Sequence, residues 1–252
     1  MNVLVLGGTQ EAQYIARKLG ERGIKVLYSI AGLAGQPTLD CDVRSGGFGG
    51  AEGLSQHLAV NNIQFLIDAT HPYAEKISRN AVIAAHQMSI PLFRYTRPPW
   101  QPHEDDDWKF VTDDWPAITM ATVRYRRPFF TIGRKPLLHM HDVPPKQSWL
   151  IRTLAASDAS NSKARVLRSR GPFVQDSERS LMLLNGIDVL VSKNSGGEMV
   201  ASKIHAAREL CIPIVMIKRP KLAPVKHDYS SPDKLIEAVP QPQTQTQVRA
   251  QA

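Results

Sequence analysis

Apolar and polar positions follow two alternating patterns along the first 96 residues of the chain. Short, nearly continuous apolar runs predict buried strands at residues 2–6, 25–30, 64–69 and 91–95. Between these runs, residues 10–22 and 73–88 place apolar and small side chains at helical spacing. Strands that alternate with helices predict a parallel sheet covered by helices on both faces.

The pattern breaks between residues 97 and 127, where prolines and an acidic cluster at residues 104–107 interrupt it. It then resumes, with strands predicted at residues 129–132, 149–154, 165–167, 188–191 and 214–217 and a helix at 198–210. We therefore predict an N-terminal Rossmann-like domain (1–96), a proline-rich linker region (97–127), a C-terminal Rossmann-like domain (128–239) and a disordered tail (240–252).

The predicted fold class is α/β, with two Rossmann-like parallel-sheet lobes and a ligand cleft between them. A single (β/α)₈ barrel is the topological alternative for a chain of 252 residues. The proline-rich break in mid-chain argues against the barrel.

Composition narrows the classes of protein and of partner. The chain is 42% hydrophobic and 21% charged, as ordinary globular proteins are. The two cysteines, Cys41 and Cys211, are too far apart in the sequence to form a C-x-x-C metal or redox motif. The sequence has neither a signal-peptide pattern nor an apolar run long enough to span a membrane. We therefore expect a cytoplasmic protein with no membrane partner. The net charge of +8 suits an acidic small molecule or a nucleic acid. Scattered basic residues and only 7% aromatic residues weaken the nucleic-acid interpretation.

A glycine-containing turn follows the first predicted strand. Gly7 and Ala12 fit the dinucleotide fingerprint G-x-G-x-x-G/A, while Thr9 stands at the middle glycine. Amides at the start of a helix attract phosphate, although a capped turn without any ligand is the alternative. The second predicted strand ends at Ser29 and Ile30 without the acid that would bind a ribose 2′-hydroxyl. If a dinucleotide binds here, this favours NADPH over NADH; the alternatives are that the acid lies elsewhere or that no adenosine binds at this place.

A second candidate site follows the strand at residues 64–69, in the sequence DATHPY. Thr70, His71 and Tyr73 are able to donate hydrogen bonds or a proton, and they stand where open α/β sheets bind ligands. Capping of the next helix by Thr70 or His71 is the structural alternative.

The second half of the chain repeats this arrangement in the sequence SKNSGG at residues 192–197. Lys193 and the loop amides predict an anion site, with a solvated lysine on a turn as the alternative. Arg134 follows another predicted strand and is suited to bind a carboxylate through two hydrogen bonds, with a merely exposed side chain as the alternative. His139 and His141 lack a third ligand nearby, so we expect no metal site.

Taken together, the motifs resemble those of the precorrin-6A reductase and cobalt-precorrin-6A reductase family of corrin (vitamin B12) biosynthesis. The matching motifs are VLGGTQEA (5–12), GGFGG (46–50), DATHPYA (68–74), YTRPPW (95–100), TIGR (131–134), GPF (171–173), KNSGG (193–197) and VMIKRP (215–220). Their order and spacing cover nearly the whole chain up to the predicted tail.

The resemblance implies an enzyme that uses NADPH to reduce one double bond of the precorrin-6A macrocycle, giving precorrin-6B. The expected partner is thus a tetrapyrrole-derived polycarboxylate and not a nucleic acid, and the oligomeric state is left open. The residues that the resemblance assigns to NADPH are Gly7, Gly8, Thr9, Glu11, Ser29, Gly32, Thr70, Ser195 and Gly196. Tyr73 and His71 are the candidate proton donors, with solvent as the alternative. The residues expected to bind the carboxylate arms of the substrate are Arg134, Lys193, Asn194 and Lys203.

Two other classes of function remain open at this stage. A sugar-nucleotide-binding transferase with two Rossmann-like lobes would bind a nucleotide sugar without a preference for nicotinamide. A basic nucleic-acid binder would show association that depends steeply on salt.

Overall fold

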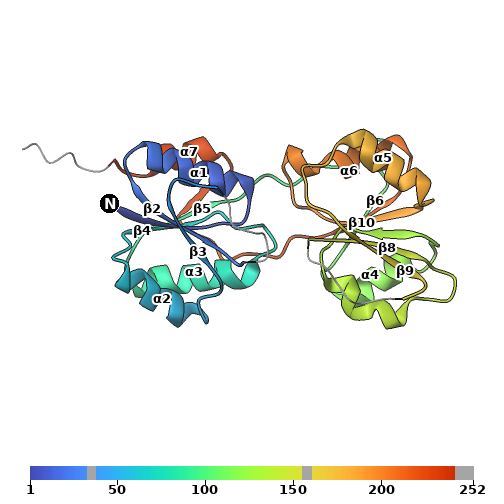
Figure 1. The fold of residues 1–252 in the computed structure, drawn as a ribbon, viewed down its shortest axis with the longest axis horizontal. Helices are drawn as coiled ribbons and strands as arrows, with labels where there is room; N and C mark the ends of the chain where they lie inside the picture. The colour runs from blue at the N-terminus through green and yellow to red at the C-terminus, as the bar shows by residue number, and fades with distance from the viewer. Residues whose placement is uncertain (33–37, 155–160, 242–252) are drawn as a thin grey trace, which may run out of the picture. The chain divides into compact units, whose positions relative to one another are not determined.

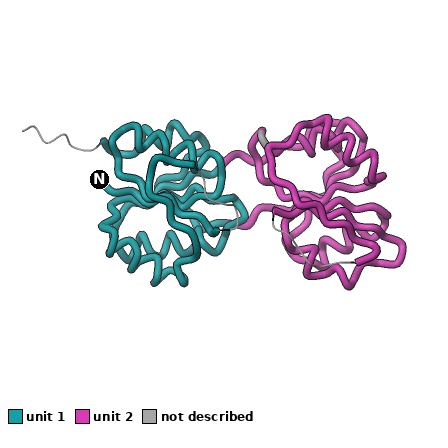
Figure 2. Tube along the Cα trace, viewed as in Figure 1, with its two compact units in different colours: residues 1–96, 222–252 teal, residues 97–221 magenta. Residues whose placement is uncertain are grey.

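The structure, a computed structural model, describes residues 1–32, 38–154 and 161–241. The chain forms two compact units (Figure 2). Unit 1 contains residues 1–96 and 222–252, and unit 2 contains residues 97–221. The chain therefore passes twice from one unit to the other, after residue 96 and after residue 221.

Unit 1 is built on a six-stranded sheet in which all pairs are parallel. Its strands are β1 (Asn2–Leu6), β2 (Lys25–Ile30), β3 (Asp42–Ser45), β4 (Phe65–Asp68), β5 (Leu92–Tyr95) and β12 (His227–Tyr229). Their order is β12-β5-β4-β1-β2-β3. From β1 the chain adds β2 and β3 on one side, and it then adds β4, β5 and β12 on the other side. The sheet therefore has a topological switch point between β1 and β4.

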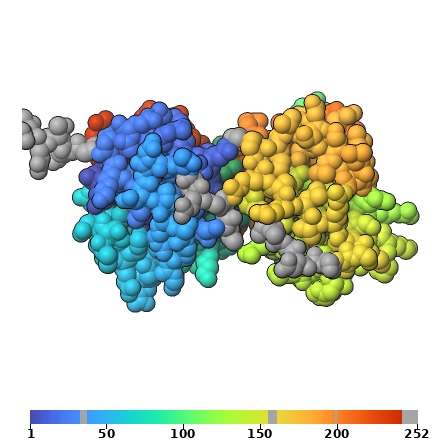
Figure 3. Space-filling model, viewed as in Figure 1, coloured from blue at the N-terminus to red at the C-terminus, as the bar shows by residue number. Residues whose placement is uncertain are grey.

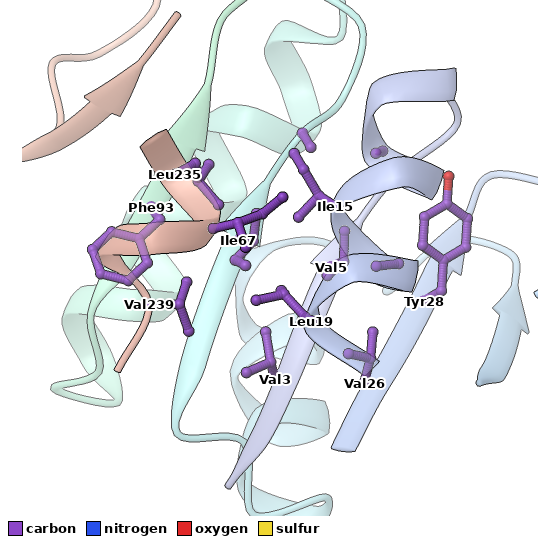
Figure 4. Packing of buried hydrophobic residues seen from close by; sticks show 14 of the residues in the cluster. Val3, Val5, Ile15, Leu19, Val26, Tyr28, Ile67, Phe93, Leu235 and Val239 are labelled. Carbon is purple, nitrogen blue, oxygen red and sulfur yellow. The ribbon is translucent and has the colours of Figure 1, made fainter. Parts of the chain in front are cut away.

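Helices cover both faces of this sheet (Figure 1). One face carries α1 (Gln10–Glu21) and α7 (Pro232–Ala238), and the other carries α2 (Ala51–Val60) and α3 (Glu75–Gln87). Alternate residues of β1 point to opposite faces: Val3 and Val5 pack with Ile15 and Leu19 of α1 (Figure 4), whereas Leu4 packs toward α2. Burial on both faces explains why the first strand is an uninterrupted apolar run.

Unit 2 repeats the architecture. Its strands are β6 (Trp108–Val111), β7 (Pro128–Phe130), β8 (Trp149–Thr153), β9 (Ala164–Arg168), β10 (Val189–Lys193) and β11 (Ile214–Ile217), in the order β6-β11-β10-β7-β8-β9. All of these pairs are parallel, and the switch point lies between β7 and β10. The helices of unit 2 are α4 (Trp115–Thr122), α5 (Gln175–Leu184) and α6 (Ser202–Glu209), with 3₁₀ segments η1 (Lys135–Asp142) and η2 (Glu198–Val200). Figure 3 shows the surface of the chain in the same view.

The predicted α/β class with two parallel sheets is confirmed, and the barrel alternative is wrong. The domain bounds differ from the prediction at two places. Residues 97–127 are not a linker, because they supply β6 and α4 to unit 2. Residues 222–239 belong to unit 1, because β12 pairs with β5 and α7 packs on the face of α1. Of the predicted disordered tail, residues 242–252 lie outside the described residues.

Candidate functional site

Three strand ends meet at the switch point of unit 1. Leu6 at the end of β1 is in register with Ser29 of β2 and with Asp68 of β4. Gly7 N donates to the Ser29 carbonyl at 2.8 Å, and Ala69 N donates to the Leu6 carbonyl at 3.0 Å. The glycine turn at residues 7–9 and the DATHPY segment, predicted separately from the sequence, thus lie at one sheet edge.

Tyr28 determines the shape of the glycine turn. A side chain at Gly7 is excluded, because a Cβ there would lie 2.2 Å from the Tyr28 ring. Gly8 has a φ of +109°, and its amide donates to the Tyr28 hydroxyl at 2.9 Å. Burial raises the pKa of this tyrosine, so the hydroxyl stays neutral. The Gly8 amide is therefore already engaged, and the predicted cofactor-binding role of Gly8 depends on the close approach of its backbone.

Thr9 is the N-cap of α1. Its buried hydroxyl accepts from the Ala12 amide at 3.0 Å and donates to the Ala69 carbonyl at 3.1 Å. The start of α1 is thereby fixed to the end of β4. Glu11 lies in the first turn of α1, and the exposed Gly32 follows β2 with a φ of +85°.

The end of β4 carries a compact polar cluster. Asp68, 1% exposed, accepts from the Thr70 hydroxyl at 2.7 Å and from the Arg94 Nε at 3.3 Å. The Thr70 and Ser78 hydroxyls are 3.3 Å apart. Sequence reasoning missed the roles of Asp68, Ser78 and Arg94. The one available signal was a charged residue inside each of two apolar runs, Asp68 and Arg94, because buried charges are normally paired.

His71 and Tyr73 stand in the turn that leads into α3, and both are half-buried. The Tyr73 amide donates to His71 Nδ1 at 3.3 Å, and the two ring centroids are 5.6 Å apart. An accepting Nδ1 means that the neutral imidazole carries its proton on Nε2. The structure brings these two candidate proton donors together at the edge that holds Thr70.

In unit 2, Lys193 ends β10 beside the end of β7. Its ammonium lies 3.9 Å from Asp113, whose backbone carbonyl accepts from the Lys135 ammonium at 2.6 Å. Burial lowers the pKa of Lys193, an effect that Asp113 opposes. Arg134 is exposed at the start of η1, in the segment that follows β7. Lys193, Lys135 and Arg134 therefore place positive charge at the carboxyl edge of this sheet.

Residues 194–197 are fixed by contacts within unit 2. The Asn194 side chain binds both the amide and the carbonyl of Trp100, at 2.8 and 3.0 Å. Gly196 has a φ of +68°, and a Cβ there would lie 2.1 Å from the Pro98 carbonyl oxygen. Arg219 donates to the backbone carbonyls of Asn194 and Ser195, at 2.7 and 3.1 Å. The amide group of Asn194 thus positions the loop, and the ligand roles of Ser195 and Gly196 stay predictions.

Lys203 occupies a different environment from the one expected. It is 8% exposed, its ammonium donates to the Val200 carbonyl at 2.7 Å, and it lies 4.8 Å from the centroid of the Trp100 ring. Burial lowers the pKa of Lys203 to about 7, an effect that Glu178 opposes. Pairing with a substrate carboxylate would require its surroundings to move, so the structure does not support the predicted role.

Possible metal ligands gather at one place among the described residues. His103, Glu104 and Asp105 bring ligand atoms within 4.8 Å of one another, but all three are exposed. His139 instead stacks on Trp115, with ring centroids 4.2 Å apart. A search of the described residues finds no helix with both the length and the apolar character that crossing a membrane requires.

The fold and the edge of unit 1 define a class, namely α/β proteins with Rossmann strand order, a glycine turn and a capped helix at the switch point. The family model described as "Precorrin-6x reductase CbiJ/CobK" matches residues 2–240. The chain belongs to this family, and it is an oxidoreductase of cobalamin biosynthesis. The resemblance expected from the motifs is confirmed, and the transferase alternative is not favoured.

Relatives of known function agree with this assignment. The "Precorrin-6A reductase" of Rhodococcus erythropolis is 41% identical over 226 residues, which cover 88% of this chain and 90% of the relative. That of Sinorhizobium sp is 38% identical, covering 88% and 87%. The solved structure of "CobK precorrin-6A reductase" superposes with a TM-score of 0.84 at 32% identity, covering 94% of this chain and 95% of the other.

Proposed function

We propose that the chain is a precorrin-6A reductase that takes its hydride from NADPH and converts precorrin-6A to precorrin-6B. The reductase activity follows from membership of the family. The observation that best supports a dinucleotide in unit 1 is the switch point between β1 and β4, with the glycine turn and the start of α1 at its edge. When bound, NADPH supplies the hydride, and the protein supplies binding and orientation.

The cofactor-binding residues that we propose are those of this edge: Gly7, Gly8, Thr9, Glu11, Ser29, Gly32 and Thr70. Gly8 lets the backbone approach a ligand closely, Gly7 makes room for the Tyr28 ring beneath the turn, and Thr9 holds the first turn of α1 in position. The helix start then offers amides and the positive end of the macrodipole to a pyrophosphate.

Arg44 supports NADPH over NADH. It lies on β3 in register with Ser29 at the end of β2, where the sequence has no acid to bind a free ribose 2′-hydroxyl. Its guanidinium donates to the Gly46 and Gly47 carbonyls at 2.7 and 2.6 Å and lies over the Phe48 ring. The Arg44 guanidinium, fixed by these contacts near the end of β2, is suited to bind the 2′-phosphate of NADPH, which NADH lacks.

The carboxylate arms of precorrin-6A call for cations, and unit 2 presents them. We propose that Lys193 and Arg134 bind these arms, while Asn194, Ser195 and Gly196 shape the adjoining loop. We do not extend this role to Lys203, because its ammonium is buried.

The reduction also needs a proton on the carbon next to the one that receives the hydride. We propose His71 or Tyr73 as its source, since both lie at the end of β4 beside Thr70. The imidazolium form of His71 is the one that can give up this proton, and the neutral imidazole left behind accepts from the Tyr73 amide at Nδ1. A cytoplasmic location is part of the proposal, and the free thiols of Cys41 and Cys211 are consistent with it.

The test is to mix the purified chain with precorrin-6A and NADPH or NADH and to follow oxidation of the nicotinamide. We expect consumption of NADPH only when precorrin-6A is present, with slower consumption of NADH. A chain that leaves NADPH unoxidised with authentic substrate would falsify the proposal. Titration with a UDP-sugar and with duplex DNA tests the two other classes, and we expect neither to bind.

A further inference from the structure

Arg94 of β5 is a buried cation with one nitrogen that lacks an acceptor. Its side chain is 3% exposed. Nε donates to Asp68 at 3.3 Å, and Nη1 donates to the Ala223 carbonyl at 2.7 Å. Nη2 is buried as well, and no acceptor for it lies within hydrogen-bond distance in the described structure. Buried guanidinium N–H groups are normally satisfied, so the missing acceptor calls for an explanation.

The side chain of Arg94 lines a small hollow at the carboxyl ends of β4 and β5. The other residues around the hollow are Asp68, Thr70, His71, Pro72, Ser78, Tyr95, Thr96 and Leu222, all from unit 1. The hollow has room for roughly one water-sized group. It adjoins Thr70 and His71, for which a cofactor-binding and a proton-donating role are proposed above.

We propose that this hollow is a ligand subsite. The side chains around it move apart slightly as the ligand enters, and Arg94 Nη2, which is buried until then, donates to an oxygen atom of the bound ligand. The inference rests on the proposed function, which supplies two sources of such an oxygen. One is the carboxamide of the nicotinamide ring, and the other is a carboxylate arm of precorrin-6A.

The place of Arg94 in the sheet favours the carboxamide. Arg44, proposed for the 2′-phosphate, lies on β3, whereas Arg94 lies on β5, on the other side of the switch point. A dinucleotide that crosses this edge has its adenosine at one side and its nicotinamide at the other. The nicotinamide end is then the one that reaches β4 and β5.

The local charge favours the same choice. Asp68 already neutralises Arg94, and its carboxylate lines the hollow. A second carboxylate there would be repelled by Asp68, whereas a neutral carboxamide oxygen would not. Asp68 and Ala223 hold the guanidinium at two nitrogens, so its third nitrogen is oriented before the ligand binds.

The experiment compares the wild-type chain with Arg94→Lys, which keeps a cation beside Asp68 but has a single nitrogen and so cannot also donate to Ala223 and to the ligand. We expect the Kd for NADPH to rise about tenfold or more, because a hydrogen bond from a charged donor is lost. The Kd for 2′-phospho-ADP-ribose, which lacks the nicotinamide ring, should not change. If instead the Kd for NADPH holds and the KM for precorrin-6A rises, the oxygen belongs to a carboxylate arm and the subsite stands.

Two further variants guard against misinterpretation. Arg22→Lys is the control. Like Arg94, Arg22 makes two hydrogen bonds within unit 1, in its case to the Ile236 and Val239 carbonyls, but it does not line the hollow, so both constants should stay unchanged. Ser78→Thr keeps the hydroxyl and adds one methyl group at the hollow, so it should weaken the same ligand without touching the Arg94–Asp68 pair.

Thermal unfolding shows which variants are folded, and Ser78→Thr decides the question if Arg94→Lys does not fold. The proposal is overturned if the folded variants bind NADPH and precorrin-6A as the wild type does, because the hollow then holds only water. Failure of the wild type itself to bind NADPH would instead overturn the proposed function.

Discussion

Gly7 and Tyr28 compete for one space at the carboxyl end of β1. The fully buried tyrosine ring lies where a side chain at residue 7 would be, and its hydroxyl accepts a hydrogen bond from the Gly8 amide. The glycine that resembles a phosphate-binding fingerprint is therefore also required by packing. The packing role of Gly7 thus falls on a residue that is also proposed to bind the cofactor.

Gly7→Ala tests the packing role. The new methyl group must displace the Tyr28 ring, so we expect a loss of about 1–3 kcal/mol in the free energy of unfolding, measured by urea denaturation. Gly20→Ala is the control, because Gly20 lies exposed in α1 with open space around it. There alanine should add about 0.5–1 kcal/mol. Equal effects of the two substitutions would show that the ring moves aside easily.

The sequence predicted which turns lie at the sheet edge, but not what holds each residue of those turns. Thr9 and Thr70 were identified from local motifs, and both lie at the expected edge. The contact of Gly196 with Pro98 and the binding of Trp100 by Asn194 join residues more than 90 positions apart. Such contacts depend on the tertiary fold, so a local pattern could not reveal that these residues serve packing.

Lys203 provides a prediction about pH. Its pKa in the folded chain is about 7, below the ordinary value of 10.5, because burial disfavours the charged form. Between these two pH values the unfolded chain binds more protons, so the free energy of unfolding rises with pH, by up to about 1.4 kcal/mol per pH unit. Below pH 7 both states are protonated, and the full destabilisation is present.

Lys203→Met should remove this dependence. We expect the variant to gain stability relative to the wild type as the pH falls from 10 toward 7, measured by urea denaturation at each pH. Parallel stability curves for the two proteins over this range would show that the buried ammonium is not destabilising.

At the scale of elements, burial on both faces decided what could be predicted. β1, β2, β4 and β5 are nearly continuous apolar runs, and the structure has strands within one or two residues of each predicted range. β6 and β12 are edge strands of the two sheets, and their residues are mostly half-buried or exposed. An edge strand needs no apolar run, so the hydrophobic pattern gave no sign of these two.

The helix α7 shows how firmly the C-terminal segment belongs to unit 1. Leu235 is fully buried in the core that α1 shares, and Arg22 at the end of α1 binds the Ile236 and Val239 carbonyls. We expect Leu235→Ala to lower the free energy of unfolding by about 2–5 kcal/mol, the usual effect of replacing a buried leucine by alanine. Lys234→Ala, on the exposed side of the same helix, should change it by less than about 0.5 kcal/mol. Similar values for both would contradict the assignment of this helix to the core of unit 1.

At the scale of the whole molecule, the net charge of +8 attracts any polyanion, whereas a binding site recognises one. This general field would attract the carboxylate arms of precorrin-6A and the phosphates of the proposed cofactor NADPH alike. Only residues that touch a ligand discriminate between the two. The effect of the overall charge can be separated from that of a direct contact by removing one positive charge at each of two different places.

Lys193→Gln and Lys163→Gln each remove one positive charge from unit 2. Lys193 is the last residue of β10, at the carboxyl edge of the sheet, whereas the exposed Lys163 directly precedes β9. If Lys193 binds a carboxylate arm, its substitution should raise the KM for precorrin-6A about tenfold and leave the Kd for NADPH unchanged. The Lys163 variant should change neither by more than about twofold, because a single exposed charge is screened at physiological salt. Equal rises in KM for both variants would mean that the substrate responds to the overall field, and Lys193 would then lose its proposed role.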